Sequence, residues 1–303
     1  MLFSIFLNDV GLVLPPGCRI FYADDVKIYM VIRNLDDCKH LQRLIDSFEE
    51  WCSDNFLTLS VNKCNVITFH HKKNPILNEY MMNNQRLARV NNVRDLGITL
   101  DEGLTYKQHY SDVIAKANRQ LGFIFKIAEE FKDPLCLKAL YCALVRSILE
   151  FGSVIWCPYH LTWIARMEAI QKKFVRYALR FLPWNDPANL PPYGDRCLLL
   201  GLETLEQRRT IAQTMFVAKT LTGEIDSPEI LGQFGFYAPE RVLRARNFLH
   251  LEARSVDYGI HDPIRFMSAV FNGFYEQFEF HNNTTTSFRG RVQRQLLNRQ
   301  PTH

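Results

Sequence analysis

Two adjacent aspartates, Asp24 and Asp25, lie between apolar and aromatic residues in the stretch RIFYADDVKIY, residues 19–29. Ionised carboxylates avoid apolar surroundings unless water, hydrogen bonds or a cation compensates their charge. The stretch therefore predicts either a turn that is open to water or a site for a divalent cation. Carboxylate oxygens suit Mg²⁺, which binds few protein ligands together with water and substrate phosphates.

Because the two aspartates are adjacent, they can act together on one ligand only if they lie at a turn. A strand sends successive side chains to opposite faces, so adjacent aspartates on a straight strand cannot both face one ligand. At the tight turn of a hairpin, both can point into one cleft. Two Mg²⁺ ions about 3.5–4 Å apart can activate a hydroxyl and stabilise a leaving pyrophosphate, which is nucleotidyl transfer. That reaction needs carboxylates from more than one strand. The alternative is an ordinary turn, in which aspartate is common for local reasons.

The elements that would position the pair come from the apolar pattern. Residues 18–32 predict two apolar strands that meet near the aspartates, which is a β-hairpin. Residues 34–55 have apolar side chains at helical spacing, with Asn34 or Asp36 as the N-cap. The alternation of apolar residues over 57–71 predicts a return to β structure.

A further short strand is expected at 91–101, and after residue 105 the pattern becomes helical. Asp133 and Pro134 predict a cap and a first-turn proline at a helix start. Residues 161–182 are strongly amphipathic. Their apolar stripe contains Met167, Ile170, Phe174, Ala178 and Phe181, and their basic stripe contains Lys172, Arg176 and Arg180. A proline-rich connector at 183–194 and helices near 203–222 and 262–278 complete the pattern.

Composition indicates an ordinary globular protein, with 47% apolar and 22% charged residues among 303. Its formal net charge is +4, and residues 1–100 are neutral with 11 basic and 11 acidic side chains. The eight cysteines lack C-x-x-C spacing and zinc-site histidine partners, which favours reduced thiols. We find no convincing signal peptide and no membrane-spanning run, so we expect a nuclear or cytoplasmic protein that is not secreted and has no membrane partner.

Several segments, in order, resemble the reverse transcriptases of non-LTR (LINE-type) retrotransposons. FYADDVKIY resembles their catalytic hairpin, LSVNKCNVITF the next palm motif, and VRDLGITLD the hairpin that supports the primer end. LKALYCALVRSILEFGSVIWCPY and MEAIQKKFVRYALR resemble the helical thumb and its connector. YGDRCLLLGLETLEQRR continues the likeness, so that it covers nearly the whole chain.

The resemblance implies an α+β fold with a partial reverse-transcriptase palm of antiparallel hairpins and a helix, followed by all-helical regions. We expect the partial palm at 1–104, without fingers and the first catalytic strand, and a thumb and connector at 105–182. A helical C-terminal extension with a basic tail would occupy 183–303. The implied reaction is RNA-directed DNA synthesis on an RNA template paired with a DNA primer, from deoxynucleoside triphosphates; the oligomeric state stays open.

Carried over by position, Asp24 would be a metal ligand and Asp25 its partner in a two-Mg²⁺ site. Lys63 would lie near the triphosphate, although a solvated lysine at a strand end explains it equally. The family takes a further metal-binding aspartate from an earlier palm strand, and the only acid before Asp24 here is Asp9. We therefore expect an incomplete two-metal site and a chain that, by itself, is inactive as a polymerase.

Four other residues acquire expected roles around the catalytic hairpin. Tyr22 and Ala23 would sit beside the incoming nucleotide and the primer. Asp95 and Gly97 would shape the primer-gripping turn, although an ordinary turn at a strand end also explains them.

A second hypothesis is a non-catalytic nucleic-acid-binding remnant. In the helix at 161–181, five basic side chains stand against Glu168 alone. They are Arg166, Lys172, Lys173, Arg176 and Arg180. In a thumb such a face would follow the phosphate backbone, whereas the alternative is a solvated helix face.

Two further interpretations complete the set. The arginines at 289, 291, 294 and 299 predict a disordered basic tail. A third hypothesis is a remnant without function that folds poorly.

Telomere-type or intron-encoded reverse transcriptases are the alternative families on the aspartate motif alone, and they fit the helical segments less well.

Overall fold

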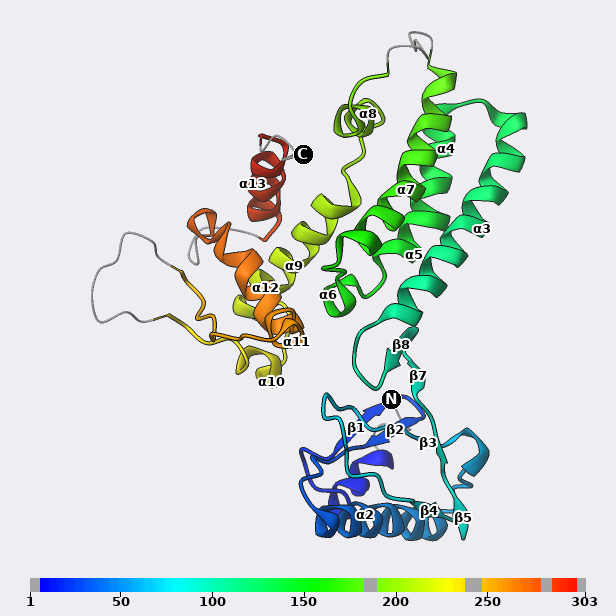
Figure 1. The fold of residues 1–303 in the computed structure, drawn as a ribbon, viewed down its shortest axis with the longest axis vertical. Coiled ribbons are helices and arrows are strands. Elements are labelled where there is room, and N and C mark those ends of the chain that lie inside the picture. Colours follow the sequence, from blue (N-terminus) through cyan, green and yellow to red (C-terminus); the bar gives the residue numbers. More distant parts are fainter. Residues whose placement is uncertain (1–5, 183–189, 238–246, 279–284, 299–303) are drawn as a thin grey trace. The chain divides into compact units, whose positions relative to one another are not determined.

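The computed structural model describes residues 6–182, 190–237, 247–278 and 285–298. It divides into two compact units, Met1–Tyr106 and Lys107–His303 (Figure 1). Every named strand lies in unit 1, whereas the named elements of unit 2 are helical. The chain is thus a mixture of helices and small sheets, compatible with the expected α+β class. Within the described residues, no helix is long and apolar enough to cross a membrane.

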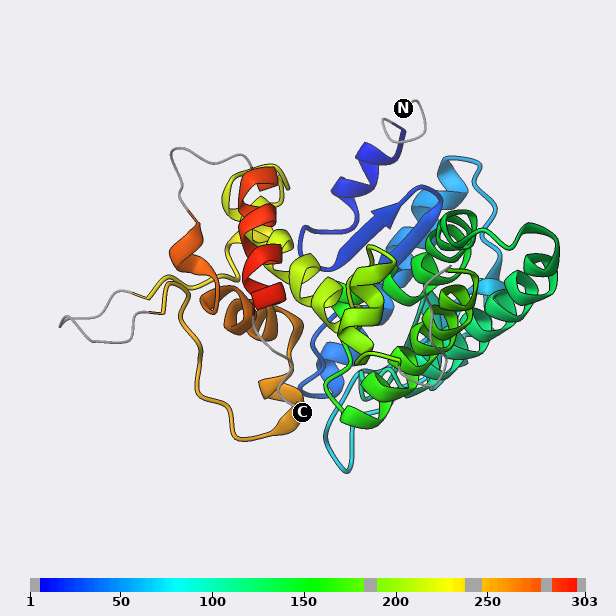
Figure 2. The same cartoon turned by 90° about the horizontal axis from the view of Figure 1, so that it is seen from above.

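In unit 1 the predicted hairpin is present and packs on a long helix. Strands β1 (Arg19–Tyr22) and β2 (Asp25–Ile28) pair antiparallel. They follow the 3₁₀ helix η1 (Leu7–Leu12) and precede α2 (Leu35–Asp54), as Figure 2 shows in blue. One core joins the three elements: Val10, Leu14, Phe21, Val26, Ile28, Leu44, Phe48 and Trp51. Burial of these side chains supplies the main stabilisation of the hairpin, since an isolated hairpin is marginal in water.

Local sequence signals define the turn before the β1–β2 hairpin and the start of the helix after it. Residues 15–17 form a turn before β1, with Gly17 at a φ of 89°. Asn34 is the N-cap of α2, as one of the two alternatives predicted. Its side chain accepts from the Asp37 N–H at 2.9 Å, and the Asp37 carboxylate accepts from the Asn34 N–H at 3.1 Å. This reciprocal capping box satisfies donors that a helix start leaves unpaired.

The strand predicted over 57–71 is mostly wrong. The segment contains a 3₁₀ turn, η2 (Val61–Lys63), and a two-residue strand, β3 (Asn65–Val66), which pairs parallel with β6 (Ala88–Arg89). The apolar alternation still operates, because Leu57 and Leu59 turn inward beside the core. Leu57 and Leu59 are therefore partly buried on alternate positions, although residues 57–60 pair with no strand among the described residues.

Two hairpins complete unit 1. Strands β4 (Met81–Met82) and β5 (Gln85–Arg86) were not expected. Their turn residues, Asn83 and Asn84, both have positive φ, which is the asparagine-rich pattern of a type I′ turn. Strands β7 (Asn92–Asp95) and β8 (Ile98–Asp101) pair antiparallel where a strand was expected.

Unit 2 contains the predicted helices and several shorter ones. In order they are α3 (Lys107–Phe131), α4 (Pro134–Tyr141), the π-helical turn η3 (Cys142–Arg146), α5 (Ser147–Glu150), α6 (Ser153–Trp156), α7 (Leu161–Ala178), η4 (Leu179–Phe181), α8 (Tyr193–Leu199), α9 (Leu205–Leu221), α10 (Pro228–Leu231), α11 (Asp257–Ile260), α12 (Pro263–Asn272), η5 (Tyr275–Gln277) and α13 (Thr285–Asn298). Asp133 caps α4 through the N–H groups of residues 135 and 136, and Pro134 occupies its first position, as predicted.

Helices α3 and α7 run side by side in the same direction (Figure 1). Tyr110 contacts Trp163 with ring centroids 5.3 Å apart, and Phe125 contacts Tyr177 at 4.3 Å. The order of these contacts along both helices makes the packing parallel. The predicted apolar stripe of α7 is buried from residue 167 to residue 178, and the side chain of Phe181 is partly buried.

The C-terminal residues correct one expectation. Residues 285–298 form the helix α13 instead of a disordered tail, because Phe288 and Val292 are fully buried among the aromatic side chains of α12 and its neighbours. Arg289 and Arg294 are exposed. Arg291 donates to the Gln277 carbonyl at 3.0 Å. Arg299 and most of the proline-rich connector, residues 183–189, lie outside the described residues.

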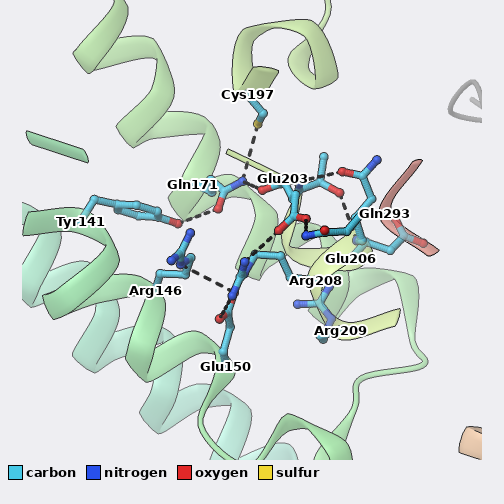
Figure 3. A network of polar contacts seen from close by, with 12 residues as sticks. Tyr141, Arg146, Glu150, Gln171, Cys197, Glu203, Glu206, Arg208, Arg209 and Gln293 are labelled. Carbon is cyan, nitrogen blue, oxygen red and sulfur yellow. Dashed lines mark hydrogen bonds and ion pairs between the residues drawn. The ribbon is translucent and has the colours of Figure 1, made fainter. Parts of the chain in front are cut away.

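A buried glutamine on α7 connects four segments of unit 2 (Figure 3). The side chain of Gln171 is fully buried. Its oxygen accepts from the Tyr141 hydroxyl at 2.9 Å, and its nitrogen donates to the Tyr193 hydroxyl at 2.9 Å and the Glu203 carbonyl at 2.8 Å. Burial raises the pKa values of both tyrosine hydroxyls, so they remain protonated donors.

Charged groups extend this network. The buried carboxylate of Glu168 accepts from the Tyr193 hydroxyl at 2.5 Å and from the Glu206 N–H at 2.8 Å. Arg208 pairs with Glu150 on α5 and with Glu203 before α9. The hydrogen bond that Arg208 donates to Glu150 is the main cause that raises the pKa of the Arg208 guanidinium.

Loss of the α2 cap should weaken unit 1. Asn34→Ala removes the acceptor for the Asp37 N–H, so we expect the free energy of unfolding to fall by about 1 kcal/mol. Chemical denaturation followed by circular dichroism measures this. Asn62→Ala, at an exposed position in η2, is the matched control and should change it by less than about 0.5 kcal/mol. Equal effects of the two substitutions would contradict the role of the cap.

Loss of the buried amide should weaken unit 2 more strongly. Gln171→Leu removes the acceptor of the Tyr141 hydroxyl and the donor to the Tyr193 hydroxyl and the Glu203 carbonyl. We therefore expect the free energy of unfolding to fall by about 2–4 kcal/mol. The control is Gln108→Leu, because Gln108 is exposed and its side chain donates to the exposed Asp112. Denaturation curves of the two variants test the network, and a Gln171→Leu protein as stable as the control would disprove its importance.

Candidate functional site

The two aspartates lie at the tip of the β1–β2 hairpin. Tyr22 and Asp25 are the last paired residues, so Ala23 and Asp24 form a two-residue turn. Ala23 has a φ of 53°, as the first central residue of a type II′ turn requires. Glycine is the usual residue there, and a left-handed alanine costs roughly 1–2 kcal/mol. The predicted turn is therefore present, and its backbone is strained.

The two faces of this hairpin differ in exposure. Phe21 and Val26 oppose each other on the face that packs on α2. Tyr22 and Asp25 oppose each other on the other face, where the Tyr22 side chain is 60% exposed. Asp24 is also exposed. Both carboxylates are thus accessible to solvent and to any ligand, with an aromatic ring beside them.

An ion pair brings a second hairpin to this open face. Lys27 follows Asp25 by two residues on the same side of β2. Its ammonium lies 2.6 Å from a carboxylate oxygen of Asp95, the last residue of β7. Leu96 and Gly97 then turn the chain with φ values of 45° and 88°. The structure therefore joins Asp95 and Gly97 to the aspartate hairpin through Lys27.

Lys63 stands apart from the pair. It is exposed at the end of η2, instead of lying on a strand. Among the described residues, no hydrogen bond or ion pair joins it to Asp24 or Asp25. The segment around it packs through Val61 and Val66 beside Ile28, which is at the end of β2 away from the turn.

The carboxylates fit a single hard cation better than a pair of cations. Mg²⁺ binds through one or two carboxylates with water and phosphate oxygens, which Asp24 and Asp25 can provide. A two-ion centre needs more carboxylates. Within the described ranges, no group of three or more histidine, cysteine or acidic side chains could hold a metal ion. The eight cysteines are free thiols.

The basic residues of α7 and η4 form the second candidate surface. Arg166, Lys172, Lys173, Arg176 and Arg180 are all exposed. At 3.6 residues per turn they fall within about a third of the helix circumference and span about 21 Å. Among the described residues, none of the five lies within ion-pair distance of a carboxylate. By contrast, Arg146, Arg208 and Arg209 are paired within the same unit.

Sequence reasoning missed Lys27. The signal was present, because a lysine two residues after Asp25 must share its side of a strand. Its partner could not be read from the sequence, since Asp95 lies on another hairpin.

Comparison with known proteins gives one distant similarity. No protein-family description matches the chain, and no solved structure matches it. Over 197 residues, 61% of the chain, the sequence is 22% identical to the RNA-directed DNA polymerase from the mobile element jockey of Drosophila melanogaster. The match spans about a fifth (21%) of that protein. The chain is thus similar to an RNA-directed DNA polymerase of a mobile element, which agrees with the resemblance of its aspartate hairpin.

Proposed function

We propose that the chain is part of a non-LTR retrotransposon reverse transcriptase, with the partial palm in unit 1 and the thumb in unit 2. The observation that carries the proposal is the hairpin turn that exposes Asp24 and Asp25 beside Tyr22. The similarity to the jockey polymerase supports it. In this role the substrates are an RNA template, a DNA primer and deoxynucleoside triphosphates.

In this proposal the aspartates are the metal ligands. Mg²⁺, when bound, would offset the negative charge of the triphosphate. Tyr22 and Ala23 would contact the nucleotide and primer, and Asp95 and Gly97 would shape the turn next to the primer. Lys63 is the weakest of the proposed catalytic residues, because nothing in its surroundings directs it toward the aspartates.

A non-catalytic binding role is the second candidate, and a separate observation favours it. The five cations of α7 and η4 are exposed, and in the described part of the chain none of them has an acidic partner. Cations that neutralise phosphates release counterions, so their contribution to binding falls as salt rises. This surface would hold an RNA–DNA hybrid whether or not the aspartates act.

Neutralising this surface should flatten the salt dependence of hybrid binding. For Lys172→Gln, Arg176→Gln and Arg180→Gln combined, we expect the slope of log affinity against log salt to fall in magnitude by roughly 2–3. Fluorescence anisotropy with a labelled RNA–DNA hybrid measures the slope. The matched control carries Lys116→Gln, Arg119→Gln and Lys126→Gln, at three exposed positions on α3. Equal slopes for the two triple variants would contradict a specific surface on α7.

Primer extension tests the catalytic part. With a primed RNA template, Mg²⁺ and deoxynucleoside triphosphates, we expect the chain of residues 1–303 to show no extension above the Asp24→Ala control, because two carboxylates cannot hold two ions. Extension that Asp24→Ala abolishes would show instead that the chain contains a complete site. Failure of the wild-type chain to bind the hybrid would count against both candidate functions.

A further inference from the structure

Three of the five cations in the basic surface lie over aromatic rings. The Arg166 guanidinium is 5.0 Å from the centroid of the Trp163 ring. The Lys172 ammonium is 5.0 Å from the Tyr193 ring, and the Arg180 guanidinium is 6.0 Å from the Tyr177 ring. Each distance is within the roughly 6 Å range over which a cation is attracted to a ring face.

The ring beside Lys172 is held firmly from behind. Tyr193 lies on α8, outside the helix that carries Lys172. Its hydroxyl donates to Glu168 at 2.5 Å and accepts from Gln171 at 2.9 Å, and both partners are buried on the inner side of α7. The inner network thereby fixes a ring whose face supports a cation on the outer side.

This contact restrains the cation without consuming its hydrogen bonds. A ring attracts an ammonium through its quadrupole and takes none of its N–H donors in a conventional hydrogen bond. A free lysine side chain loses much rotamer freedom when it is ordered by a ligand. A lysine that is already held in place loses less on binding, and binding is correspondingly tighter.

We propose that Tyr193 is a positioning residue that holds the Lys172 ammonium toward the phosphate backbone of a bound nucleic acid. The inference rests on the proposed nucleic-acid function of the α7 surface. Trp163 and Tyr177 support Arg166 and Arg180 in the same way, but their rings also pack on α3. Tyr193 also joins α8 to α7 through its hydroxyl, so a comparison in a Lys172→Gln background is needed to separate its effect on binding from its effect on packing.

A double-mutant cycle on hybrid affinity tests the proposal. Tyr193→Leu removes the ring, so we expect it to weaken hybrid binding roughly twofold to fivefold. In a Lys172→Gln background the same change should have no further effect, because the group it positions is gone. Tyr193→Phe keeps the ring and should retain most of the affinity. An equal loss in both backgrounds would mean that Tyr193 acts only on the fold, and would overturn the proposal.

A measurement on the unmodified chain guards against a Tyr193→Leu variant that does not fold. Protons of the Lys172 side chain that lie over a ring face should resonate upfield in a spectrum of the ¹³C-lysine-labelled protein. Lys173, the next residue, is exposed and serves as the matched reference. Lys172 signals that coincide with those of Lys173 would overturn the inference. Failure of the wild-type chain to bind the hybrid, with the upfield shift present, would instead overturn the proposed function.

Discussion

The hydrogen bonds of Gln171 are the constraint on which unit 2 depends. A buried amide without partners is costly, so its oxygen and nitrogen must find them within the protein. They find Tyr141 on α4, Tyr193 on α8 and the chain before α9, which draws three segments onto α7. Apolar packing would bring these elements together in many orientations. The directional hydrogen bonds of Gln171 select one of these orientations. In that orientation the basic side chains of α7 are exposed on its outer side.

Helix α7 therefore has two sides with opposite requirements. The inner side carries Glu168 and Gln171, and both need partners because both are desolvated. The outer side carries exposed cations that, among the described residues, lie outside ion-pair distance of any carboxylate, whereas Glu150 and Glu203 bind Arg208 and Glu168 binds Tyr193. Exposed ion pairs contribute little to stability, so leaving these cations unpaired costs the fold little. A ligand with phosphate groups gains the most from them.

In unit 1 the main constraint is the placement of two adjacent carboxylates. Adjacent ionised carboxylates can share a face only at a turn, and the hairpin meets this at the expense of a left-handed alanine. Because residues two apart on a strand share a face, Lys27 lies on the same side of β2 as Asp25. An unpaired Lys27 ammonium there would compete with a cation for the Asp25 carboxylate. Its pairing with Asp95 occupies that ammonium and fixes the neighbouring hairpin. The packing of the hairpin on α2 thus offsets the strain at Ala23, and the ion pair with Asp95 offsets the charge of Lys27.

The sequence by itself determined the features that short-range physics controls. The β1–β2 hairpin, α2 with its Asn34 cap, the Asp133 start of α4 and the two sides of α7 all follow from residue spacing and capping chemistry. Only the tertiary structure decided the Lys27–Asp95 pair, the Gln171 bonds, the Tyr193 ring beneath Lys172 and the packing that makes α13 a helix. The same limit explains the wrong strand at 57–71. Alternation specifies which side chains turn inward, but a strand also needs a neighbour, and neighbours are chosen by packing between segments far apart in the chain.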